Sequence, residues 1–362
     1  MKISNIFSRT YKKILYSIFI IFYGKVTFLN KKAKEVQTKK INSVNSINIR
    51  KFNYKFFEIK QGRLFTNYVE CVGVISKNFL IKEISFQQIN GILKKSKNQI
   101  LETGTPKILK KFSGKILSLS QGASGHNNYS HWLLDIVPKL IMASEKYNLQ
   151  KIDFFYFSKI NSFQKQSLKF LNLNPNKFID SNIYRHVQAS TIFAVSHPNY
   201  FYGTFFDAHS NLPIWIVSSL KKTFLNKKFK IKKKFQNIFI DRSDSIQSHC
   251  KLINNQEIIN YLKKKNFKIL KLSKLDFNDQ ISVFNNCKNI IAPHGAGLAN
   301  LVFCKKKTKV IEIIPKNHDN SVYKRISKIN KLNYKSIRCD FISGNKLGDM
   351  FLDIKRLKKK LI

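Results

Sequence analysis

The chain has 362 residues, of which 43% are apolar, so it is long enough for two domains with their own cores and is not intrinsically disordered. Its formal net charge is +46, but the lysines are spread along the whole sequence without a helix-turn-helix, RNP-type or zinc-finger pattern, so we expect no specific nucleic-acid partner. Five dispersed cysteines without a CxxC pair argue against a disulfide framework or a zinc site and fit a reducing compartment.

The N-terminal segment, residues 1–50, contains a short apolar run between lysines. The run Ile14–Tyr23 is flanked by Lys12, Lys13 and Lys25. It is too short to span a bilayer, which needs about 20 apolar residues, and no small-residue cleavage site follows it. We interpret it as an interfacial anchor with affinity for anionic lipids. A helix packed in the core of the first domain is the alternative.

Residues 51–225 are predicted to form the first domain. Between Gly62 and Gln87, short apolar runs alternate with turn residues, which predicts a small antiparallel meander. A helix at Ser130–Ala143 should be kinked at Pro138, which lacks the N–H that would bond to the carbonyl of Leu134. The other predicted elements are strands at Lys115–Leu119, Asp153–Phe157 and Ile192–Val195 and helices at Ser162–Leu171 and Ile214–Leu225.

Residues 226–362 are predicted to form the second domain, which begins in the basic stretch Lys227–Lys234. Apolar strands alternate regularly with amphipathic helices, a pattern typical of an α/β fold with a doubly wound parallel sheet. The final segment, Asp349–Leu361, is predicted to be one basic helix. The strands are expected at Asn237–Ile240, Lys268–Leu272, Asn289–Ala292, Lys309–Ile313 and Tyr334–Ile337, and the helices at Gln256–Lys265, Asp279–Cys287, Gly297–Phe303 and Ser321–Lys331.

A glycine turn, His294–Leu298, joins the third of these strands to the next helix. Two glycines let the backbone come close to a ligand, and the start of a helix presents free N–H groups and a positive dipole end. Such a turn suits a diphosphate. Glycines also serve tight turns that bind nothing, so the turn alone leaves both interpretations open.

Two charged residues are expected at the same edge of the sheet as the glycine turn. Arg242 follows the first strand of the second domain, and Glu312 lies near the end of the fourth. Ligands of parallel α/β sheets sit beyond the carboxyl ends of the strands. There Arg242 can hold a diphosphate and Glu312 can accept ribose hydroxyls. Taken singly, Arg242 can equally be a surface charge and Glu312 a solvated strand end. The missing GxGxxG argues against a standard dinucleotide site.

The first domain contains a second cluster, His126–Asp135. His131 and Asp135 are four residues apart and share a helix face. The carboxylate can orient the imidazole or act as the base itself, and Tyr129 and Trp132 could stack on a sugar. An ordinary helix with an i,i+4 pair is the alternative. We find no nucleophile elbow, no HExxH and no clustered carboxylates, so no metal is expected.

These motifs together resemble glycosyltransferase family 61, whose bacterial members are described as capsular polysaccharide biosynthesis proteins. The likeness runs from about Gly62 to the C-terminus. The resemblance implies a GT-B arrangement of two Rossmann-like domains facing a cleft, with the donor nucleotide held mainly by the second. It also implies inverting transfer without an obligatory metal or a cofactor. The matching segments are Asn128–Leu140, Arg242, His294–Phe303 and Val310–Ile313.

Carried over to this chain, the resemblance assigns the donor side to Arg242, His294, Gly295, Ala296, Gly297, Leu298 and Glu312, with Arg242 balancing the diphosphate charge. His131 or Asp135 would face the acceptor hydroxyl. One segment departs from the family. A second arginine is usual before the helix at Gln256, but this chain has Lys251 there, within Ser248–Glu257. A lysine lacks the bidentate fork of an arginine, so donor affinity or identity could differ and activity could be weaker.

The sequence therefore predicts a cytoplasmic glycosyltransferase, peripheral at the inner face of the plasma membrane. It would move a sugar from a nucleotide diphosphate donor to a glycan or lipid-linked saccharide in capsule or lipopolysaccharide biosynthesis. One alternative is a non-catalytic basic protein that binds nucleic acid or anionic polysaccharide with steep salt dependence. Another is a different nucleotide-using GT-B enzyme, such as an epimerase, which would have carboxylates in the cleft.

Overall fold

The computed structural model describes residues 3–29, 33–41, 53–67, 71–89, 92–94, 97–120, 127–199, 205–226, 233–245, 250–316, 318, 321–340 and 348–361. Contacts divide the chain into two compact units, Met1–Ala208 and His209–Ile362. The division comes before the predicted junction at residues 225/226, because helix α7 (Ile214–Phe224) packs against elements of the second unit. His126, Ser248 and His249 lie outside the described residues.

The first unit is built on a mixed sheet, 12-stranded within the described residues. Its main path is β1-β6-β5-β4-β12-β9-β10-β11, with β2, β3, β7 and β8 attached to the side. The strands are β1 (Thr27–Phe28), β2 (Val36–Lys40), β3 (Lys55–Lys60), β4 (Arg63–Thr66), β5 (Cys71–Ser76), β6 (Phe79–Leu80), β7 (Phe86–Ile89), β8 (Ile92–Lys94), β9 (Lys110–Ser118), β10 (Phe154–Phe157), β11 (Phe178–Asp180) and β12 (His186–Val195).

Strand direction divides this sheet into two parts. Strands β12, β9, β10 and β11 pair in parallel, whereas β3 and β4 pair antiparallel with successive halves of β12. The predicted meander is confirmed in β4, β5, β6 and β7, which pair antiparallel, but it belongs to the large sheet. The first unit is therefore mixed rather than uniformly parallel.

The helical elements of the first unit include one that carries the predicted acceptor-side residues. This segment is continuous from α3 (Tyr129–His131) through a π turn (Trp132–Ile136) to α4 (Val137–Lys146). The others are α1 (Ile3–Tyr23), α2 (Ile100–Thr103), α5 (Ser162–Phe170) and short 3₁₀ turns at Lys82–Ile84, Leu149–Lys151 and Pro175–Lys177, with α6 (Phe205–Ser210) crossing into the second unit.

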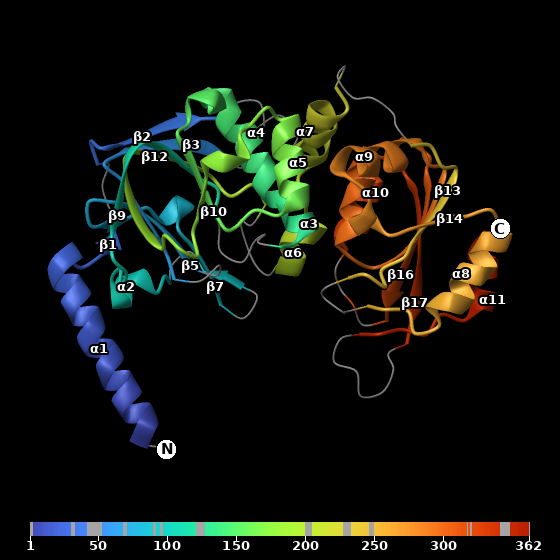
Figure 1. The fold of residues 1–362 in the computed structure, drawn as a ribbon, viewed down its shortest axis with the longest axis horizontal. Helices are drawn as coiled ribbons and strands as arrows, with labels where there is room; N and C mark the ends of the chain where they lie inside the picture. The colour runs from blue at the N-terminus through green and yellow to red at the C-terminus, as the bar shows by residue number, and fades with distance from the viewer. Residues whose placement is uncertain are drawn as a thin grey trace. The chain divides into compact units, whose positions relative to one another are not determined.

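Helix α1 contacts the first unit at its C-terminal end (Figure 1). The Tyr23 ring packs edge-on against His186, with centroids 4.9 Å apart, and its hydroxyl accepts a hydrogen bond of 3.1 Å from the Leu109 amide. Within the described residues, no helix has the length and apolarity that crossing a membrane requires. The helix leaves a row of large apolar side chains exposed, namely Tyr11 (68%), Ile14 (56%), Ile18 (43%), Ile21 (81%) and Phe22 (75%).

The second unit is a five-stranded, fully parallel sheet of order β14-β13-β15-β16-β17. Its inner strands are apolar and buried, as expected when helices cover both faces. Helices α8 and α11 lie on one face, and α9 and α10 lie on the other (Figure 1). This confirms the predicted doubly wound sheet. The elements are β13 (Asn237–Ile240), α8 (Asn255–Lys264), β14 (Lys268–Leu270), α9 (Phe277–Asn286), β15 (Asn289–Pro293), β16 (Lys309–Pro315), α10 (Val322–Ile329), β17 (Asn333–Cys339) and α11 (Ile354–Leu361), with 3₁₀ helices η5 (Leu272–Lys274) and η6 (Ala296–Phe303).

Helix α11 begins later than the predicted start at Asp349. Asp349 accepts a hydrogen bond of 3.1 Å from the Lys251 amide, and Met350 forms a β-bridge with Leu252. These pairings hold the chain extended up to Asp353, whose side chain accepts from the Lys355 amide at 2.8 Å. The prediction was wrong here because a partner distant in the sequence takes these backbone groups.

Candidate functional site

A capped helix positions His131 and Asp135, which are predicted to lie on the acceptor side. The Asn128 side chain accepts hydrogen bonds from the amides of Ser130 (2.9 Å) and His131 (3.2 Å), which satisfies donors that a helix start leaves free. The π turn follows, in which the Val137 amide bonds to the Trp132 carbonyl. Pro138 follows in the first turn of α4, where it has no N–H to donate to the preceding turn. The irregularity predicted at Pro138 thus takes the form of a π turn, a feature often found at functional sites.

His131 and Asp135 form a hydrogen-bonded pair within this segment. The Nδ1 atom of His131 lies 2.7 Å from Oδ2 of Asp135. The Asp135 side chain is fully buried, at 0% exposed, whereas that of His131 is 12% exposed. The two residues are therefore not equivalent. Asp135 cannot meet an acceptor directly, but it can fix the tautomer and orientation of His131.

The expectation that Trp132 stacks on a sugar is wrong. Its ring is fully buried, with its centroid 5.6 Å from that of Phe157. Its indole N–H donates to the Ser167 hydroxyl at 2.9 Å, so Trp132 anchors the helix to α5. Tyr129 is half-buried, with its ring 5.4 Å from that of Phe163. Of the two aromatic residues, Tyr129 is the more exposed.

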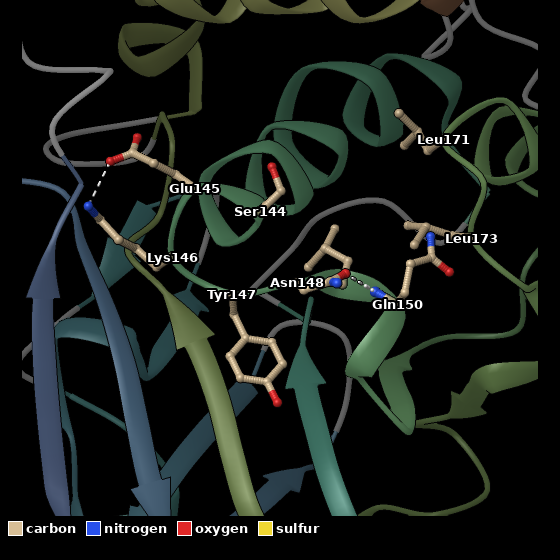
Figure 2. A pocket seen from close by; sticks show the side chains of 9 residues that line it. Ser144, Glu145, Lys146, Tyr147, Asn148, Gln150, Leu171 and Leu173 are labelled. Atoms are coloured by element: carbon tan, nitrogen blue, oxygen red, sulfur yellow. Dashed lines mark hydrogen bonds and ion pairs between the residues drawn. The ribbon is translucent and has the colours of Figure 1, made fainter.

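A pocket of about 560 Å³ lies at the C-terminal end of α4 (Figure 2). Glu145 and Lys146 form an ion pair of 2.9 Å on its wall. The Asn148 side chain accepts from the Gln150 amide at 2.9 Å. His131 and Asp135 belong to the other end of the helical segment and do not line this pocket. It therefore contains none of the predicted catalytic residues.

The structure brings together Arg242 and the glycine turn, both of which are predicted to bind the donor. Nη1 of Arg242 donates to the His294 carbonyl, and Nη2 lies 3.4 Å from the Ser245 hydroxyl. A Cβ atom at Gly295 would overlap the guanidinium of Arg242, so the glycine leaves the space that this guanidinium occupies. Burial lowers the pKa of Arg242, but an arginine remains cationic in proteins. The turn therefore holds a fixed positive charge.

The topology places this contact at a recognised kind of ligand site. Arg242 follows β13 and His294 follows β15, and these strands are neighbours in the sheet. The connection from β13 leads to β14 on one side, while that from β15 leads to β16 on the other. In sheets of this order, the crevice where the connections diverge is the usual place for a nucleotide-like ligand.

Glu312 is buried rather than solvated. It is 1% exposed, and its Oε1 lies 2.5 Å from Nδ1 of His294. Its Oε2 accepts a hydrogen bond from the Tyr334 hydroxyl. On its other side, His294 meets His318 through a 3.0 Å contact between their Nε2 atoms. Because both oxygens of Glu312 already have partners, its position favours support of His294 over contact with a ribose.

The remaining residues of the turn have packing roles. A Cβ atom at Gly297 would come 2.5 Å from Leu272. Leu298 is buried, and its amide bonds to the Gly295 carbonyl at 3.0 Å. The Asn300 side chain donates to the Gly297 carbonyl (3.1 Å) and to Gln280 of α9 (3.0 Å). Ala296 and Gly297 are half-exposed, so they present the accessible backbone of the turn.

The segment that contains Lys251 begins close to Arg242. Burial raises the pKa of Cys250 to about 11, and the Arg242 charge acts in the opposite direction. The next residue, Lys251, is fixed through its backbone, since its carbonyl accepts from the Met350 amide at 2.7 Å. Lys251 therefore follows Cys250, which lies near Arg242.

A smaller pocket, of about 320 Å³, adjoins the donor-side residues. His318 and Tyr334 line it together with Lys324 and Arg338. Because His318 and Tyr334 also contact His294 and Glu312, this pocket is next to the glycine turn and has cationic walls. Within the described residues, no group of three His, Cys, Asp or Glu side chains could hold a metal ion.

Sequence reasoning missed four residues around these sites. Cys250, His318 and Tyr334 lie near Arg242 or the glycine turn through contacts with residues distant in the sequence. Lys139 is 2% exposed and follows Asp135 by four residues on the same helical segment. Its spacing was visible in the sequence, but nothing there indicated its burial.

A family model, Glycosyltransferase 61, matches residues 129–311, which is half of the chain. The chain belongs to glycosyltransferase family 61. The matched region begins at Tyr129, at the start of the acceptor-side helix, and includes both Arg242 and the glycine turn. Glu312 and the strands before Tyr129 lie outside it. No curated protein gives a match to the chain. Membership of the family supports a glycosyltransferase role, with a nucleotide sugar donor and a glycan acceptor in general terms.

Proposed function

We propose that the protein transfers a sugar from a nucleotide diphosphate sugar to a hydroxyl group of a surface glycan of the capsule or lipopolysaccharide type. The observation that carries this proposal is the contact between Arg242 and the glycine turn at the carboxyl edge of β13 and β15. A cation and the half-exposed turn residues Ala296 and Gly297 at that edge suit the diphosphate that departs during transfer. The neighbouring cationic pocket at Lys324 and Arg338 also favours an anionic donor.

The proposed reaction is an inverting displacement in a GT-B-like enzyme, with the acceptor side in the first unit and the donor side in the second. His131 takes the proton of the acceptor hydroxyl as this oxygen attacks the anomeric carbon and the bond to the diphosphate breaks. Asp135 orients His131 and balances the imidazolium that forms. Arg242 and the turn Gly295–Gly297 stabilise the departing diphosphate. In this scheme no metal or further cofactor takes part.

The proposed location is the inner face of the plasma membrane, where a lipid-linked saccharide acceptor is found. The exposed residues Tyr11, Ile14, Ile18, Ile21 and Phe22 of α1 support this part of the proposal. Their spacing of three, four, three and one places them on one stripe of the helix. Exposed Lys12, Lys13 and Lys25 flank the apolar run. This combination suits a helix that lies in the headgroup region of an anionic bilayer.

A thermal-shift screen of nucleotide diphosphates and nucleotide sugars tests the donor site. A ligand at a hundred times its dissociation constant stabilises the folded state by about 2.7 kcal/mol. We expect a nucleotide diphosphate to raise the melting temperature of the wild type and Arg242→Ala to abolish the rise. Arg185→Ala, which removes a half-buried arginine from the first unit, is the control and should keep it.

Two other outcomes would contradict the proposal. Equal stabilisation of the wild type and Arg242→Ala would remove Arg242 from the site. Stabilisation by unrelated polyanions, independent of Arg242 and lost in salt, would instead indicate a basic binding protein.

A further inference from the structure

A further pocket lies at the edge of the second unit's sheet where the strands begin. Its volume is about 600 Å³, within the range of roughly 300–1,000 Å³ that is typical of ligand sites. It is lined by Asn237, Asn289 and Lys309. These are the first residues of β13, β15 and β16, and they are register partners across the three neighbouring strands. Arg242 and the glycine turn follow the opposite ends of these strands, so this amino-edge pocket is separate from the proposed donor site.

Three lysines from different elements line the amino-edge pocket. Lys265 lies at the end of α8, Lys309 begins β16, and Lys358 is in the last turn of α11. All three are exposed, and among the described residues no Asp or Glu lines the pocket. The helix dipole ordinarily accounts for a lysine at the end of a helix. Lys309 lies at the start of a strand, where no such dipole exists, so the helices do not account for all of this charge.

The floor of the amino-edge pocket is apolar and recessed. Tyr261 and Leu361 are half-buried and pack against the core of the second unit, and Phe267 is 8% exposed. The Nζ atom of Lys358 lies 5.6 Å from the centroid of the Tyr261 ring, so a cation–π contact holds this ammonium at the floor. Apolar side chains that insert into a bilayer must project from the surface. The recessed floor therefore favours a small occupant over a membrane.

Two amides at the strand starts add hydrogen-bonding groups. The Nδ2 atom of Asn289 donates to Oδ1 of Asn237 at 2.7 Å, which aligns the two side chains across neighbouring strands. Nδ2 of Asn237 approaches the Asn266 carbonyl at 3.5 Å. Each amide has two N–H donors and an oxygen with two acceptor sites, so these contacts leave capacity for the hydroxyls of a ligand. The pocket thus combines ammonium groups, an apolar surface and amides.

We propose that the amino-edge pocket binds an acidic saccharide in which successive sugar units carry a carboxylate. Lysines on three elements match charges that are spread along an oligosaccharide better than the concentrated charge of one phosphate. The C–H faces of the sugars contact the apolar floor, and their hydroxyls meet the amides of Asn237 and Asn289. In naming a glycan as the occupant, this inference rests on the proposed function. It adds that the acceptor polymer is acidic and is held away from the donor edge.

The experiment is an isothermal titration of the full-length protein with trigalacturonate, and with maltotriose as a neutral trisaccharide. We expect trigalacturonate to bind and maltotriose not to bind. A pocket variant changes all three lysines, by the substitutions Lys265→Gln, Lys309→Gln and Lys358→Gln. It should bind trigalacturonate roughly tenfold more weakly, since three exposed ion pairs are lost.

A charge-matched control removes three exposed lysines from the first unit, by the substitutions Lys110→Gln, Lys111→Gln and Lys159→Gln. It should bind trigalacturonate as the wild type does. If the pocket variant does not fold, Lys309→Glu reverses a single charge at an exposed strand start and should also weaken binding. An unchanged affinity in that single variant would overturn the proposal.

Three further outcomes would overturn the proposal. One is binding of trigalacturonate that is no tighter than that of maltotriose, and another is equal weakening in the pocket variant and its control. The third is tighter binding of oligothymidylate, inorganic phosphate or anionic vesicles through the same three lysines, which would assign another occupant.

The two proposals can fail separately. Binding of trigalacturonate that depends on the pocket lysines, in a protein that no nucleotide diphosphate stabilises, would keep the saccharide site and refute the proposed function. Stabilisation by a nucleotide diphosphate that depends on Arg242, without any binding of trigalacturonate, would keep the proposed function and overturn the saccharide site.

Discussion

The guanidinium of Arg242 occupies the space where a side chain at position 295 would begin. Arg242 follows β13 and Gly295 follows β15, so the contact joins two neighbouring strands at their carboxyl ends. The glycine leaves room here for a side chain that follows another strand, whereas its own backbone is extended and open to any residue.

Gly295→Ala should displace Arg242 and abolish nucleotide-induced stabilisation, as we also expect for Arg242→Ala. The added methyl group overlaps the guanidinium, so either the turn or Arg242 must move. The measurement is the melting temperature with and without a nucleotide diphosphate. Gly62→Ala is the control, because its Cβ would clash with Ile59 and Ile192 in the first unit. It should lower the melting temperature but keep the ligand-induced rise. A normal rise in Gly295→Ala would show that the contact is dispensable.

Replacing His131 should lower the rate of transfer much more than it lowers the affinity for the donor. Loss of a general base typically costs 10²–10⁴ in rate. We expect His131→Gln and Asp135→Asn each to slow transfer by factors in that range, since Asp135 acts through its 2.7 Å contact with His131. Single-turnover transfer rates and nucleotide thermal shifts on the same variants separate the two effects. Near-normal transfer by both variants would place the base elsewhere.

Transfer should continue when divalent metal ions are removed. Arg242 and the turn amides can neutralise the diphosphate without a metal, which motivates the expectation. Once a donor and an acceptor have been identified, product formation is measured before and after treatment with EDTA. We expect product formation to be unchanged. Complete loss with EDTA, restored by magnesium or manganese, would refute a metal-independent mechanism.

The stability difference between the wild type and Lys139→Met should depend on pH. Below pH 7, Lys139 is charged in both the folded and unfolded states. The free energy of unfolding of the wild type is then lowered by the full cost of burying a charge. The pKa of Lys139 in the folded state, about 7, lies below the ordinary value of 10.5. The wild type should therefore gain stability relative to the variant as pH rises from 7 toward 10, by at most about 1.4 kcal/mol per unit. Urea unfolding of both proteins at each pH measures this, and a constant difference would contradict the assigned burial.

Binding to anionic vesicles should depend on the exposed face of α1. Ile18→Asn with Ile21→Asn removes two exposed apolar side chains and should weaken co-sedimentation with anionic vesicles. The control is Ile108→Asn, which changes an isoleucine that is 83% exposed elsewhere in the first unit. Binding should also fall in high salt, because salt screens the lysines. Equal recovery of the wild type with neutral and anionic vesicles at low salt would argue for a protein that does not dock on membranes.

The second unit was largely predictable because its signals are local. Each strand is a short apolar run followed by a helix, and parallel strands place their carboxyl ends at one edge. That rule alone brought Arg242 and Gly295 to the same place. The i,i+4 spacing likewise predicted the pairing of His131 with Asp135.

The features that could not be predicted depend on partners distant in the sequence. Trp132 is buried because its indole N–H donates to Ser167 and its ring packs against Phe157. Glu312 is buried because Tyr334 and His294 take its two oxygens. None of these partners is marked by local periodicity. The mixed sheet of the first unit also depends on distant partners, because β12 pairs with β3 and β4 from far earlier in the sequence.

The central position of β12 also sets the order in which the chain can fold. The Lys55 amide of β3 bonds to the Ser196 hydroxyl just beyond β12, across 141 residues of sequence. Long-range pairings of this kind form slowly, because the intervening loop must be closed first. During synthesis, β3 and β4 must therefore wait for most of the first unit to emerge. In the second unit the paired strands are closer in the sequence, as for Asn237 and Asn289, so this delay is shorter there. Chaperone dependence and aggregation during expression should accordingly originate in the first unit.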